Sequence, residues 1–447
     1  MTTTLGPRIV VAGVASGVGK TTIATGLMAA LRAQGMRVGN AKVGPDFIDP
    51  GYHALATGRP PRNLDSWICG EAAIPGLAGR AASGTDILVV EGVMGLFDGA
   101  ADGEPEASTA SIARLLDAPV LLVVDASAMS GSVAALVHGY ATFDPSVRIA
   151  GVILNRVGSP GHESLLRHAL EPLGVPVLGA LHRDDAFTWR DHHLGLVPVV
   201  EASAETSRSI DRLADAIKTS LDLRAIVQVA RSAPTRPVEG VPVPRRVGHA
   251  RVAIASGPAF GFVYQDNLEA LAAAGAELLP FDPRHDPHLP DGSTGLYVGG
   301  GFPEVFVAGL SDNQALQRDL RAKAEGEFVI WAECGGLLWL SRSLDGHPLT
   351  GLIPADGSMT PRLTLGYRTA ELSVDCPLGA AGDQLRGHEF HYSALSPTGA
   401  ALALRSRAGE ATAGFASPRL FASYLHLHLG SDPARAERFV AAASAGT

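Results

Sequence analysis

Two stretches of this sequence combine residue types whose spacing suits chemistry. The first is Gly13-Val14-Ala15-Ser16-Gly17-Val18-Gly19-Lys20-Thr21-Thr22, which is typical of a loop that cradles phosphate. The second is Ala332-Glu333-Cys334-Gly335-Gly336, with His426-Leu427-His428 far downstream, which is typical of a nucleophilic cysteine on a tight turn with a histidine base. Together they indicate a chain that uses a nucleotide at one site and cleaves a carbon–nitrogen bond at another.

The glycine-rich stretch lies between a short strand, Ile9–Ala12, and a helical stretch, Ala24–Arg32, the order that a phosphate loop requires. Its spacing is one residue longer than the common Gly-x4-Gly-Lys-Thr form. The alternative is a glycine turn before a core helix, which would not need the lysine and two threonines. The residues expected to bind the nucleotide are Gly17, Gly19, Lys20, Thr21, Thr22, Lys42 and Asn155.

Charged side chains follow the next predicted strands, where a parallel sheet presents its ligands. Lys42 supplies a second cation for a transferring phosphoryl group. We expect Mg²⁺ to be held by Thr21, Asp46 and Glu91, because hard cations prefer oxygen ligands. Asn155 ends a later strand, where an asparagine can read the adenine edge. Three further acids are harder to place, and helix or turn capping is an open interpretation for each of them: Asp49, Asp65 and Asp98. Substrate contact is the alternative for Asp49 and Asp65.

Cys334 follows an apolar strand, Phe328–Trp331, and precedes a short helical stretch. A nucleophile on such a turn stands exposed at the sheet edge, and a helix N-terminus favours the thiolate. His426 or His428 is the expected base. Gly299-Gly300-Gly301 follows another strand and offers backbone N–H groups for an oxyanion hole. The alternative is that Cys334 is a small core residue, the reading that we prefer for Cys69 and Cys376.

Two histidine pairs, His388-Glu389-Phe390-His391 and His426-Leu427-His428, invite a metal interpretation. A structural zinc site usually has four protein ligands, often including cysteine. We therefore favour base and substrate-orienting roles. The residues expected at the substrates are Asp49, Asp65, Gly300, Gly301, His388, Glu389 and His391.

The elements that must position these residues form two alternating units. The predicted strands of the first half are Ile9–Ala12, Arg37–Lys42, Ile87–Val90, Val120–Val124, Ala150–Leu154 and Val177–Ala180. Strands that alternate with helices predict a doubly wound parallel sheet of the α/β class. Residues 232–248 are proline-rich and aperiodic, which predicts a linker. The domains are therefore expected at 1–231 and 249–447.

The second unit repeats the alternation and then becomes rich in strands. The predicted strands are Val252–Ala255, Glu277–Leu279, Leu296–Val298, Phe328–Trp331, Arg368–Val374, Gly387–Tyr392 and Gly414–Tyr424.

Composition sets outer limits on function. The chain has 447 residues, of which 46% are hydrophobic and 18% charged, as in globular proteins of two or three domains. A net charge of -9 argues against nucleic acid as a partner. Three widely spaced cysteines and the lack of a signal segment or a long apolar run indicate a cytoplasmic protein without a membrane partner.

The motifs in their order resemble cobyrinic acid a,c-diamide synthases, including the hydrogenobyrinic acid enzymes of the aerobic pathway. The resemblance rests on the two opening motifs and on Lys42-Val43-Gly44-Pro45-Asp46, Asn63-Leu64-Asp65, Glu91-Gly92-Val93-Met94-Gly95, Gly387-His388-Glu389-Phe390-His391 and Ser423-Tyr424-Leu425-His426-Leu427-His428. It implies a dethiobiotin-synthetase-like ATP domain joined to a class I glutamine amidotransferase domain.

The resemblance also implies a ligase that amidates the a and c acetates of a corrinoid in cobalamin biosynthesis, with ATP, Mg²⁺ and glutamine. The nitrogen would come as ammonia from glutamine and would displace phosphate from a phosphorylated carboxylate. Arg59, Arg62 and Arg80 are candidates for the carboxylate-rich rim, with surface solvation as the alternative. The resemblance leaves a homodimer open. In the wider class a glutamate often stands at the position of His428, so the third member of the Cys334–His426 site stays undecided.

Three alternatives share part of the pattern. Cobyric acid synthase has the same two domains but more often ends in Tyr-x-His-Gly. A related amidase acts on a nickel tetrapyrrole. Regulatory ATPases that position chromosomes or the division septum share the phosphate loop, but they lack an amidotransferase half, so Cys334 and its surroundings argue against them.

Overall fold

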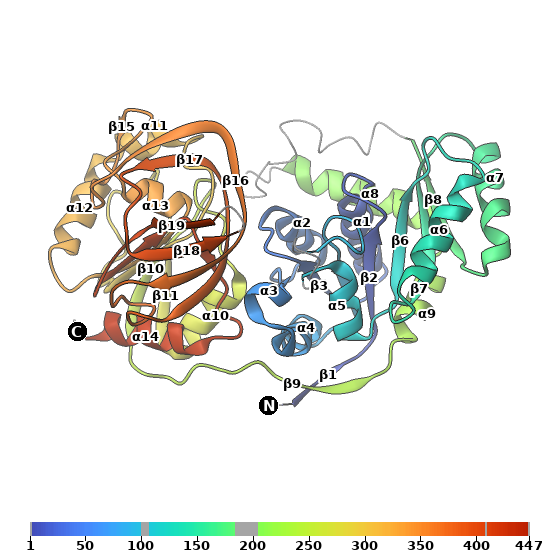
Figure 1. Ribbon diagram of the computed structural model, residues 1–447, viewed down its shortest axis with the longest axis horizontal. Coiled ribbons are helices and arrows are strands. Elements are labelled where there is room, and N and C mark those ends of the chain that lie inside the picture. Colours follow the sequence, from blue (N-terminus) through green and yellow to red (C-terminus); the bar gives the residue numbers. More distant parts are fainter. Residues whose placement is uncertain (1, 100–106, 184–203, 407–408, 446–447) are drawn as a thin grey trace. The chain divides into compact units, whose positions relative to one another are not determined.

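The computed structural model describes residues 2–99, 107–183, 204–406 and 409–445. The chain divides into two compact units, Met1–Val241 and Pro242–Thr447, each with its own sheets and core (Figure 1). The division falls inside the proline-rich segment at residues 232–248.

The N-terminal unit is built on a seven-stranded parallel sheet of order β4-β3-β5-β2-β6-β7-β8. All six strands that the sequence predicts here are present, and the parallel doubly wound sheet is confirmed. The bounds are β2 (Arg8–Gly13), β3 (Val38–Val43), β4 (Asn63–Leu64), β5 (Ile87–Glu91), β6 (Val120–Asp125), β7 (Ile149–Val157) and β8 (Val177–His182).

Helices cover both faces of this sheet. Ile9 and Val11 of β2 are fully buried and belong to the core formed with α1, α8 and α9, whereas α4 packs against β3 and β5. The bounds are α1 (Lys20–Ala33), α2 (Ile48–Thr57), α3 (Ser66–Cys69), α4 (Ile74–Ala82), α5 (Thr109–Leu116), α6 (Ser132–Phe143), α7 (Pro160–Leu170), α8 (Ala204–Ser220) and α9 (Leu223–Arg231).

Part of the predicted linker is a strand. β9 (Arg236–Glu239) pairs antiparallel with β1 (Thr2–Leu5), which the sequence analysis did not predict. Pro237 can occupy this strand because a two-stranded sheet consists only of edges, where a missing N–H is tolerated. The segment is therefore anchored to the N-terminal unit up to Glu239.

The C-terminal unit contains a six-stranded sheet of order β11-β10-β12-β13-β21-β20, in which only the pairing of β20 with β21 is antiparallel. The predicted strand at 414–424 is in fact a hairpin, because Pro418 and Arg419 turn the chain. The bounds are β10 (Ala250–Ala255), β11 (Ala276–Phe281), β12 (Gly295–Val298), β13 (Val329–Glu333), β20 (Phe415–Ser417) and β21 (Leu420–Ser423).

A second, largely antiparallel sheet follows in this unit, built around the long pair β16 and β17. Its last strand, β22, continues directly from β21 and pairs with β17, so that one chain segment joins the two sheets. The bounds are β14 (Ser343–Leu344), β15 (His347–Pro348), β16 (Asp356–Leu372), β17 (Gln384–Ser396), β18 (Leu402–Ser406), β19 (Gly409–Ala413) and β22 (His426–Leu427).

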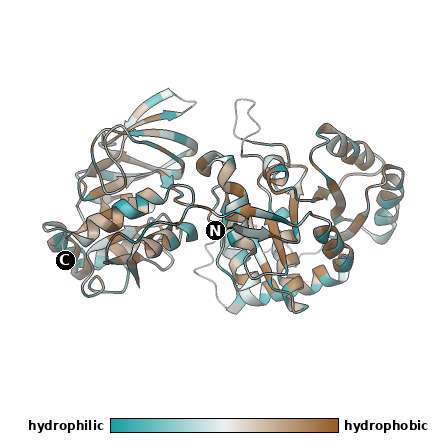
Figure 2. Cartoon of the chain, turned by 90° about the horizontal axis from the view of Figure 1, so that it is seen from below, coloured by the Kyte–Doolittle hydropathy of each residue, from teal (hydrophilic) through white to brown (hydrophobic). Residues whose placement is uncertain are grey.

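Helices enclose the parallel sheet of this unit. Val252 of β10 and Trp331 of β13 share a core with α10 and α14, whereas the alternate residues Ala253 and Ala332 share one with α12 and α13. In both units the strands of the parallel sheet are mainly hydrophobic, and polar residues lie on the outer helices (Figure 2). The bounds are α10 (Gln265–Ala274), α11 (Val307–Asp312), α12 (Gln314–Ala324), α13 (Gly335–Leu340) and α14 (Pro433–Ser444).

Within the described ranges, every helix is too short or too polar to cross a membrane.

Candidate active sites

The glycine loop joins β2 to α1 and has backbone conformations that favour glycine. Gly17 has φ 74° and Gly19 has φ 94°, which side chains with a Cβ rarely adopt. Lys20 Nζ donates to the carbonyl of Ala15 at 2.9 Å, and Asn155 Nδ2 donates to the carbonyl of Val18 at 2.8 Å. Asn155 therefore braces the loop from the end of β7, a contact that the adenine hypothesis did not include.

The first turn of α1 lies against a cluster of acids. The Thr21 hydroxyl donates to Glu91 Oε1 at 2.5 Å and is 3.1 Å from Asp49 Oδ2. Lys42 Nζ lies 3.0 Å from both of these carboxylates. The structure thus brings together Thr21, Lys42 and Glu91 as the sequence predicted and adds Asp49, which we had expected at the substrate. Thr22 follows in the same turn and is half-buried.

Burial and mutual attraction set the charges of this cluster. Burial opposes the charge of Lys42, but Glu91 and Asp49 outweigh it and hold its pKa above the usual value. Burial and Asp49 act to raise the pKa of Glu91, yet Lys42 and His53 bring it below its usual range. Burial and then the neighbouring Lys42 lower the pKa of Lys20 to about 8. Glu91 is thus a carboxylate at neutral pH, as a metal ligand must be.

His53 is a residue of this site that the sequence analysis missed. It lies on α2, is fully buried, and its Nε2 is 2.6 Å from Glu91 Oε2. His53 lies outside the motifs that the sequence offers, so no local pattern marks it as a site residue. The three hard oxygen donors of Thr21, Asp49 and Glu91, next to a phosphate loop, fit the ligand preference of Mg²⁺.

The other predicted acids bind backbone groups. Asp46 accepts from the N–H of Ile48 at 2.8 Å at the start of α2, and burial together with Asp49 raises its pKa to about 7. Asp65 caps α3 through the N–H of Ile68, and Asp98 accepts from the N–H of Gly95. These contacts agree with capping, an interpretation that the sequence left open for Asp65 and Asp98.

One of the arginines named as candidates for the substrate rim is engaged within the fold: Arg59 donates to the carbonyl of Ser83.

The cysteine stands where β13 turns into α13. Cys334 has φ 50° and ψ -102°, a conformation that costs roughly 1–3 kcal/mol for a residue with a side chain. Such strain occurs where a strand-to-helix turn projects a nucleophile. We expected an exposed thiol, but Cys334 is only 5% exposed, because β17 covers it and its Sγ lies 3.7 Å from the carbonyl of Phe390.

His426 reaches the same place from β22 and is 2% exposed. Its Nδ1 lies 3.5 Å from Glu333 Oε2. Burial opposes the charge of His426, but hydrogen bonding to Cys334 and Glu333 outweighs burial and raises the pKa of His426 to about 10. The site therefore favours an imidazolium at His426, beside the side chain of Cys334.

The glycines after β12 line the other side of His426. A Cβ on Gly300 would lie 2.5 Å from Cε1 and 3.1 Å from Nε2 of His426, and one on Gly335 would lie 3.0 Å from the nitrogen of Gly301. The N–H of Gly300 donates to the carbonyl of Phe262, so it is engaged within the fold. Gly301 is therefore the better candidate of the two for an oxyanion donor.

β17 supplies the residues next to the cysteine. His388 pairs with His426 in the strand register, and Glu389 forms an ion pair with Arg368 at 2.8 Å. His391 stacks on Tyr424 with a centroid distance of 3.7 Å. Burial lowers the pKa of His388 to about 3 and that of His391 to about 4, with His426 adding to both effects. Both imidazoles are therefore neutral at pH 7.

His428 has different neighbours. Its Nδ1 accepts from the N–H of Gly430 at 3.1 Å, its Nε2 lies 3.8 Å from Asp266, and its ring packs on Tyr264. These contacts bind the end of the chain segment to α10 and do not include Cys334.

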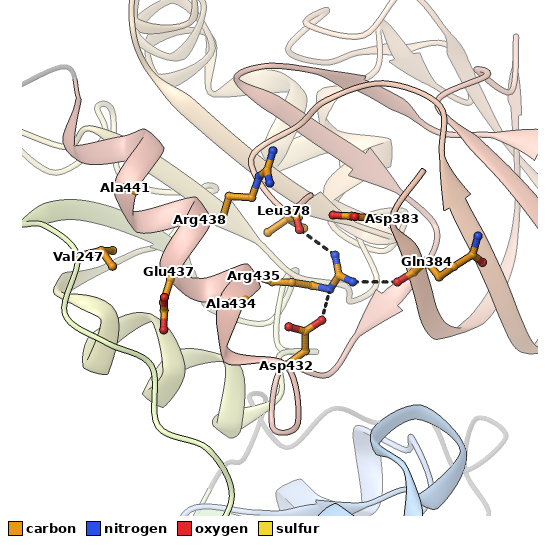
Figure 3. Close-up of a pocket in the computed structure, with 10 residues that line it drawn as sticks. All are labelled: Val247, Leu378, Asp383, Gln384, Asp432, Ala434, Arg435, Glu437, Arg438 and Ala441. Atoms are coloured by element: carbon orange, nitrogen blue, oxygen red, sulfur yellow. Dashed lines mark hydrogen bonds and ion pairs between the residues drawn. The ribbon is translucent and has the colours of Figure 1, made fainter. Parts of the chain in front are cut away.

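A cavity of about 440 Å³ next to α14, lined by Arg435 and Arg438 among others, includes none of the predicted site residues (Figure 3).

The two sites define a class of protein that combines a phosphate-loop nucleotide-binding unit with an amidotransferase-like unit. Residues 9–196 match the CobQ/CobB/MinD/ParA nucleotide binding domain, and residues 251–434 match the CobB/CobQ-like glutamine amidotransferase domain.

Similarity to curated proteins extends over nearly the whole chain. A hydrogenobyrinate a,c-diamide synthase of Streptomyces coelicolor is 48% identical, with 97% of each chain covered. One of Mycobacterium bovis is 46% identical, with 98% of each covered. A cobyrinate a,c-diamide synthase of Syntrophotalea carbinolica is 44% identical, with 97% of this chain and 98% of the relative covered. The chain belongs to the family of hydrogenobyrinate and cobyrinate a,c-diamide synthases.

Proposed function

We propose that this chain uses ATP, Mg²⁺ and glutamine to amidate the a and c acetate carboxylates of hydrogenobyrinic or cobyrinic acid. The observation that carries the proposal is the similarity to a hydrogenobyrinate a,c-diamide synthase, which covers 97% of both chains and so includes both sites. We assign the ATP-dependent step to the N-terminal unit and the hydrolysis of glutamine to the C-terminal unit.

In the C-terminal unit, the Cys334 thiolate attacks the side-chain amide carbon of glutamine. The N–H groups near Gly301 stabilise the oxyanion that forms. The carbon–nitrogen bond then breaks, the leaving nitrogen takes the proton held by His426, and ammonia departs from a glutamyl thioester. Water hydrolyses the thioester to glutamate, and its proton returns to His426 while the thiolate is restored.

The neutral residues of β17 are proposed to shape the glutamine pocket. His388 and His391 bear no charge at neutral pH, so they can orient a substrate by hydrogen bonds without competing with His426 for a proton. The carboxyl group of Glu389 lies 2.8 Å from Arg368; burial raises the pKa of Glu389, and Arg368 opposes part of that effect. The pair offers an acid and a base near β17 for the two charged ends of an amino acid.

In the N-terminal unit, Lys20 and Lys42 offset the charge of the phosphoryl group that passes to a carboxylate of the ring. Thr21, Asp49 and Glu91 would hold Mg²⁺, with Asp46 close by at the start of α2. The ion would neutralise phosphate charge and orient the leaving group. A phosphorylated carboxylate is an electrophile that ammonia can attack, and phosphate leaves as the amide forms.

The test is to incubate the protein with ATP, Mg²⁺, glutamine and either ring, with or without cobalt, and to weigh the products. Two carboxyl-to-amide conversions are expected, and Cys334→Ala should convert the ring only when ammonia replaces glutamine. Hydrolysis of ATP and glutamine with both rings unchanged would refute the substrate but not the two-site chemistry. Conversion by Cys334→Ala with glutamine alone would refute the assigned nucleophile.

A further inference from the structure

Glu333 directly precedes the nucleophile, is fully buried, and uses both carboxylate oxygens. Its Oε1 accepts from the N–H of Leu427 at 3.1 Å. Its Oε2 accepts from the hydroxyl of Tyr297 at 3.3 Å and lies 3.5 Å from Nδ1 of His426. A buried carboxylate is costly unless its partners compensate for the lost water, so these contacts define what the residue does in the fold.

The two edges of the His426 ring face different groups. Nδ1 faces Glu333, and the Cε1 and Nε2 edge faces Gly300, beside the turn that carries Cys334. In a nucleophile–histidine pair, the nitrogen away from the nucleophile donates its hydrogen to an acceptor, and that contact fixes the tautomer of the ring. Glu333 is placed to be that acceptor. The distance of 3.5 Å is longer than a normal hydrogen bond, as is common for catalytic contacts without substrate.

Other carboxylates around this site are engaged with other partners. The wider class often has a glutamate where this chain has His428, and His428 contacts Asp266 and Gly430. Glu389 is paired with Arg368. The titratable groups that interact with His426 include Glu333 at the end of β13, Cys334 in the turn after it, and His388, Glu389 and His391 from β17.

Glu333 belongs to a hydrogen-bond network that includes β12 and α10. Tyr297 of β12 donates to the carboxylate, and Asn267 of α10 donates both to the Tyr297 hydroxyl at 3.2 Å and to the carbonyl of Leu427 at 2.7 Å. Asn267 also accepts from the N–H of Leu429 at 2.7 Å. The segment that bears His426 and the carboxylate that faces it are therefore fixed by one network.

We propose that Glu333 is the positioning residue of the Cys334–His426 pair. In the wider class this role often belongs to a glutamate two residues after the histidine, at the position that His428 occupies here. It keeps the hydrogen of the neutral ring on Nδ1, so that Nε2 serves Cys334 and the leaving nitrogen, and it stabilises the imidazolium. β13 thus ends in the acid that orients the base, and the next residue in the chain is the nucleophile. The proposal rests on glutamine hydrolysis at Cys334.

The experiment compares Glu333→Gln, Glu333→Asp and His428→Asn, with Cys334→Ala and His426→Asn as references. Glutamate release from glutamine is measured from pH 6 to 10, and ammonia-dependent amidation of the ring is measured in parallel. For Glu333→Gln we expect kcat for glutamine to fall by about 10²- to 10⁴-fold with KM nearly unchanged, because the amide favours the wrong tautomer. Glu333→Asp should recover part of the activity, and ammonia-dependent amidation should persist.

Two results would overturn the proposal. One is a Glu333→Gln enzyme with the kcat and pH profile of the wild type while Cys334→Ala and His426→Asn are inactive. The other is that His428→Asn loses glutaminase activity by about 10²- to 10⁴-fold while Glu333→Gln keeps the wild-type activity. Glutaminase activity that survives Cys334→Ala would instead refute the proposed nucleophile, so the two failures are distinguishable.

A second variant tests the proposal in case Glu333→Gln does not fold. Tyr297→Phe removes one hydrogen bond to Glu333 Oε2 and leaves the carboxylate in place. If circular dichroism and urea unfolding show that Glu333→Gln is misfolded, Tyr297→Phe should still lower kcat for glutamine several-fold and shift the pH profile. An unchanged profile in Tyr297→Phe would then count against the proposal.

Discussion

The ammonium group of Lys42 lies 3.0 Å from the carboxylate of Glu91, and both side chains are buried beside the phosphate loop. Neither charge can reach water when the other is removed. Asp49 and His53 complete the neighbourhood, at 3.0 Å from Lys42 and 2.6 Å from Glu91 respectively. The pair therefore links the stability of the N-terminal unit to its nucleotide chemistry.

Glu91→Gln should destabilise the N-terminal unit by about 3 kcal/mol, because it leaves Lys42 buried with less compensation. Lys42→Met should cost a similar amount, and the double variant should cost less than the sum by about 1 kcal/mol or more. Urea unfolding of the four proteins measures this coupling. Asp86→Asn, in the exposed pair with Arg37, is the matched control and should change stability by about 0.5 kcal/mol at most. Additive losses for Lys42 and Glu91 would contradict the interaction.

His388 makes the stability of the C-terminal unit depend on acid. Burial, with a contribution from His426, lowers its pKa from 6.5 to about 3. The unfolded chain therefore binds a proton below pH 6.5 that the folded chain does not, so stability is lost as pH falls from 6.5 toward 3, by up to about 1.4 kcal/mol per pH unit.

The measurement compares the urea midpoints of the wild type and His388→Gln at pH 7 and pH 5, followed by tryptophan fluorescence. The variant should lose less stability on acidification, since glutamine does not titrate. Equal losses in both proteins would show that His388 does not titrate differently in the folded and unfolded states.

Gly300→Ala should impair glutamine hydrolysis, because a Cβ there would lie 2.5 Å from Cε1 of His426. We expect at least a 10-fold fall in glutamine-dependent kcat, while ammonia-dependent amidation stays near the wild-type rate. Gly326→Ala is the control, since its Cβ would meet its nearest neighbour at 3.5 Å. Steady-state kinetics with each nitrogen donor decide the matter, and equal effects on both donors would contradict a local action on His426.

The backbone conformation of Cys334 should lower the stability of the protein, although the position of the thiol depends on it. Glycine adopts φ 50° without the strain that a Cβ brings, so Cys334→Gly should be more stable than Cys334→Ala by about 1 kcal/mol, although both lack the thiol. Chemical unfolding of the two variants measures the difference. An alanine variant as stable as the glycine variant would mean that the backbone relaxes when the sulfur is removed.

Local patterns in the sequence determined much of this protein. A strand, a glycine loop and a helix in that order place Lys20 and Thr21 without any long-range information, and the same is true of the strand and sharp turn around Cys334. The alternation of strands and helices likewise determined the parallel sheets, because short crossovers admit few topologies.

Only the tertiary structure decided which distant side chains meet. Thr21 and Asp49 meet because the first turn of α2 lies next to the phosphate loop, and no sequence motif predicts that contact. The role of His53 follows only from the tertiary structure, in which its Nε2 lies 2.6 Å from Glu91 Oε2. The acid at His426 could not be predicted from the His-x-Glu spacing, because β22 joins the second sheet and turns position 428 toward Asp266. The pairing of β13 with β21 and that of β17 with β22 place Glu333 at His426 instead. A register is fixed by the packing of two cores rather than by any short run of residues.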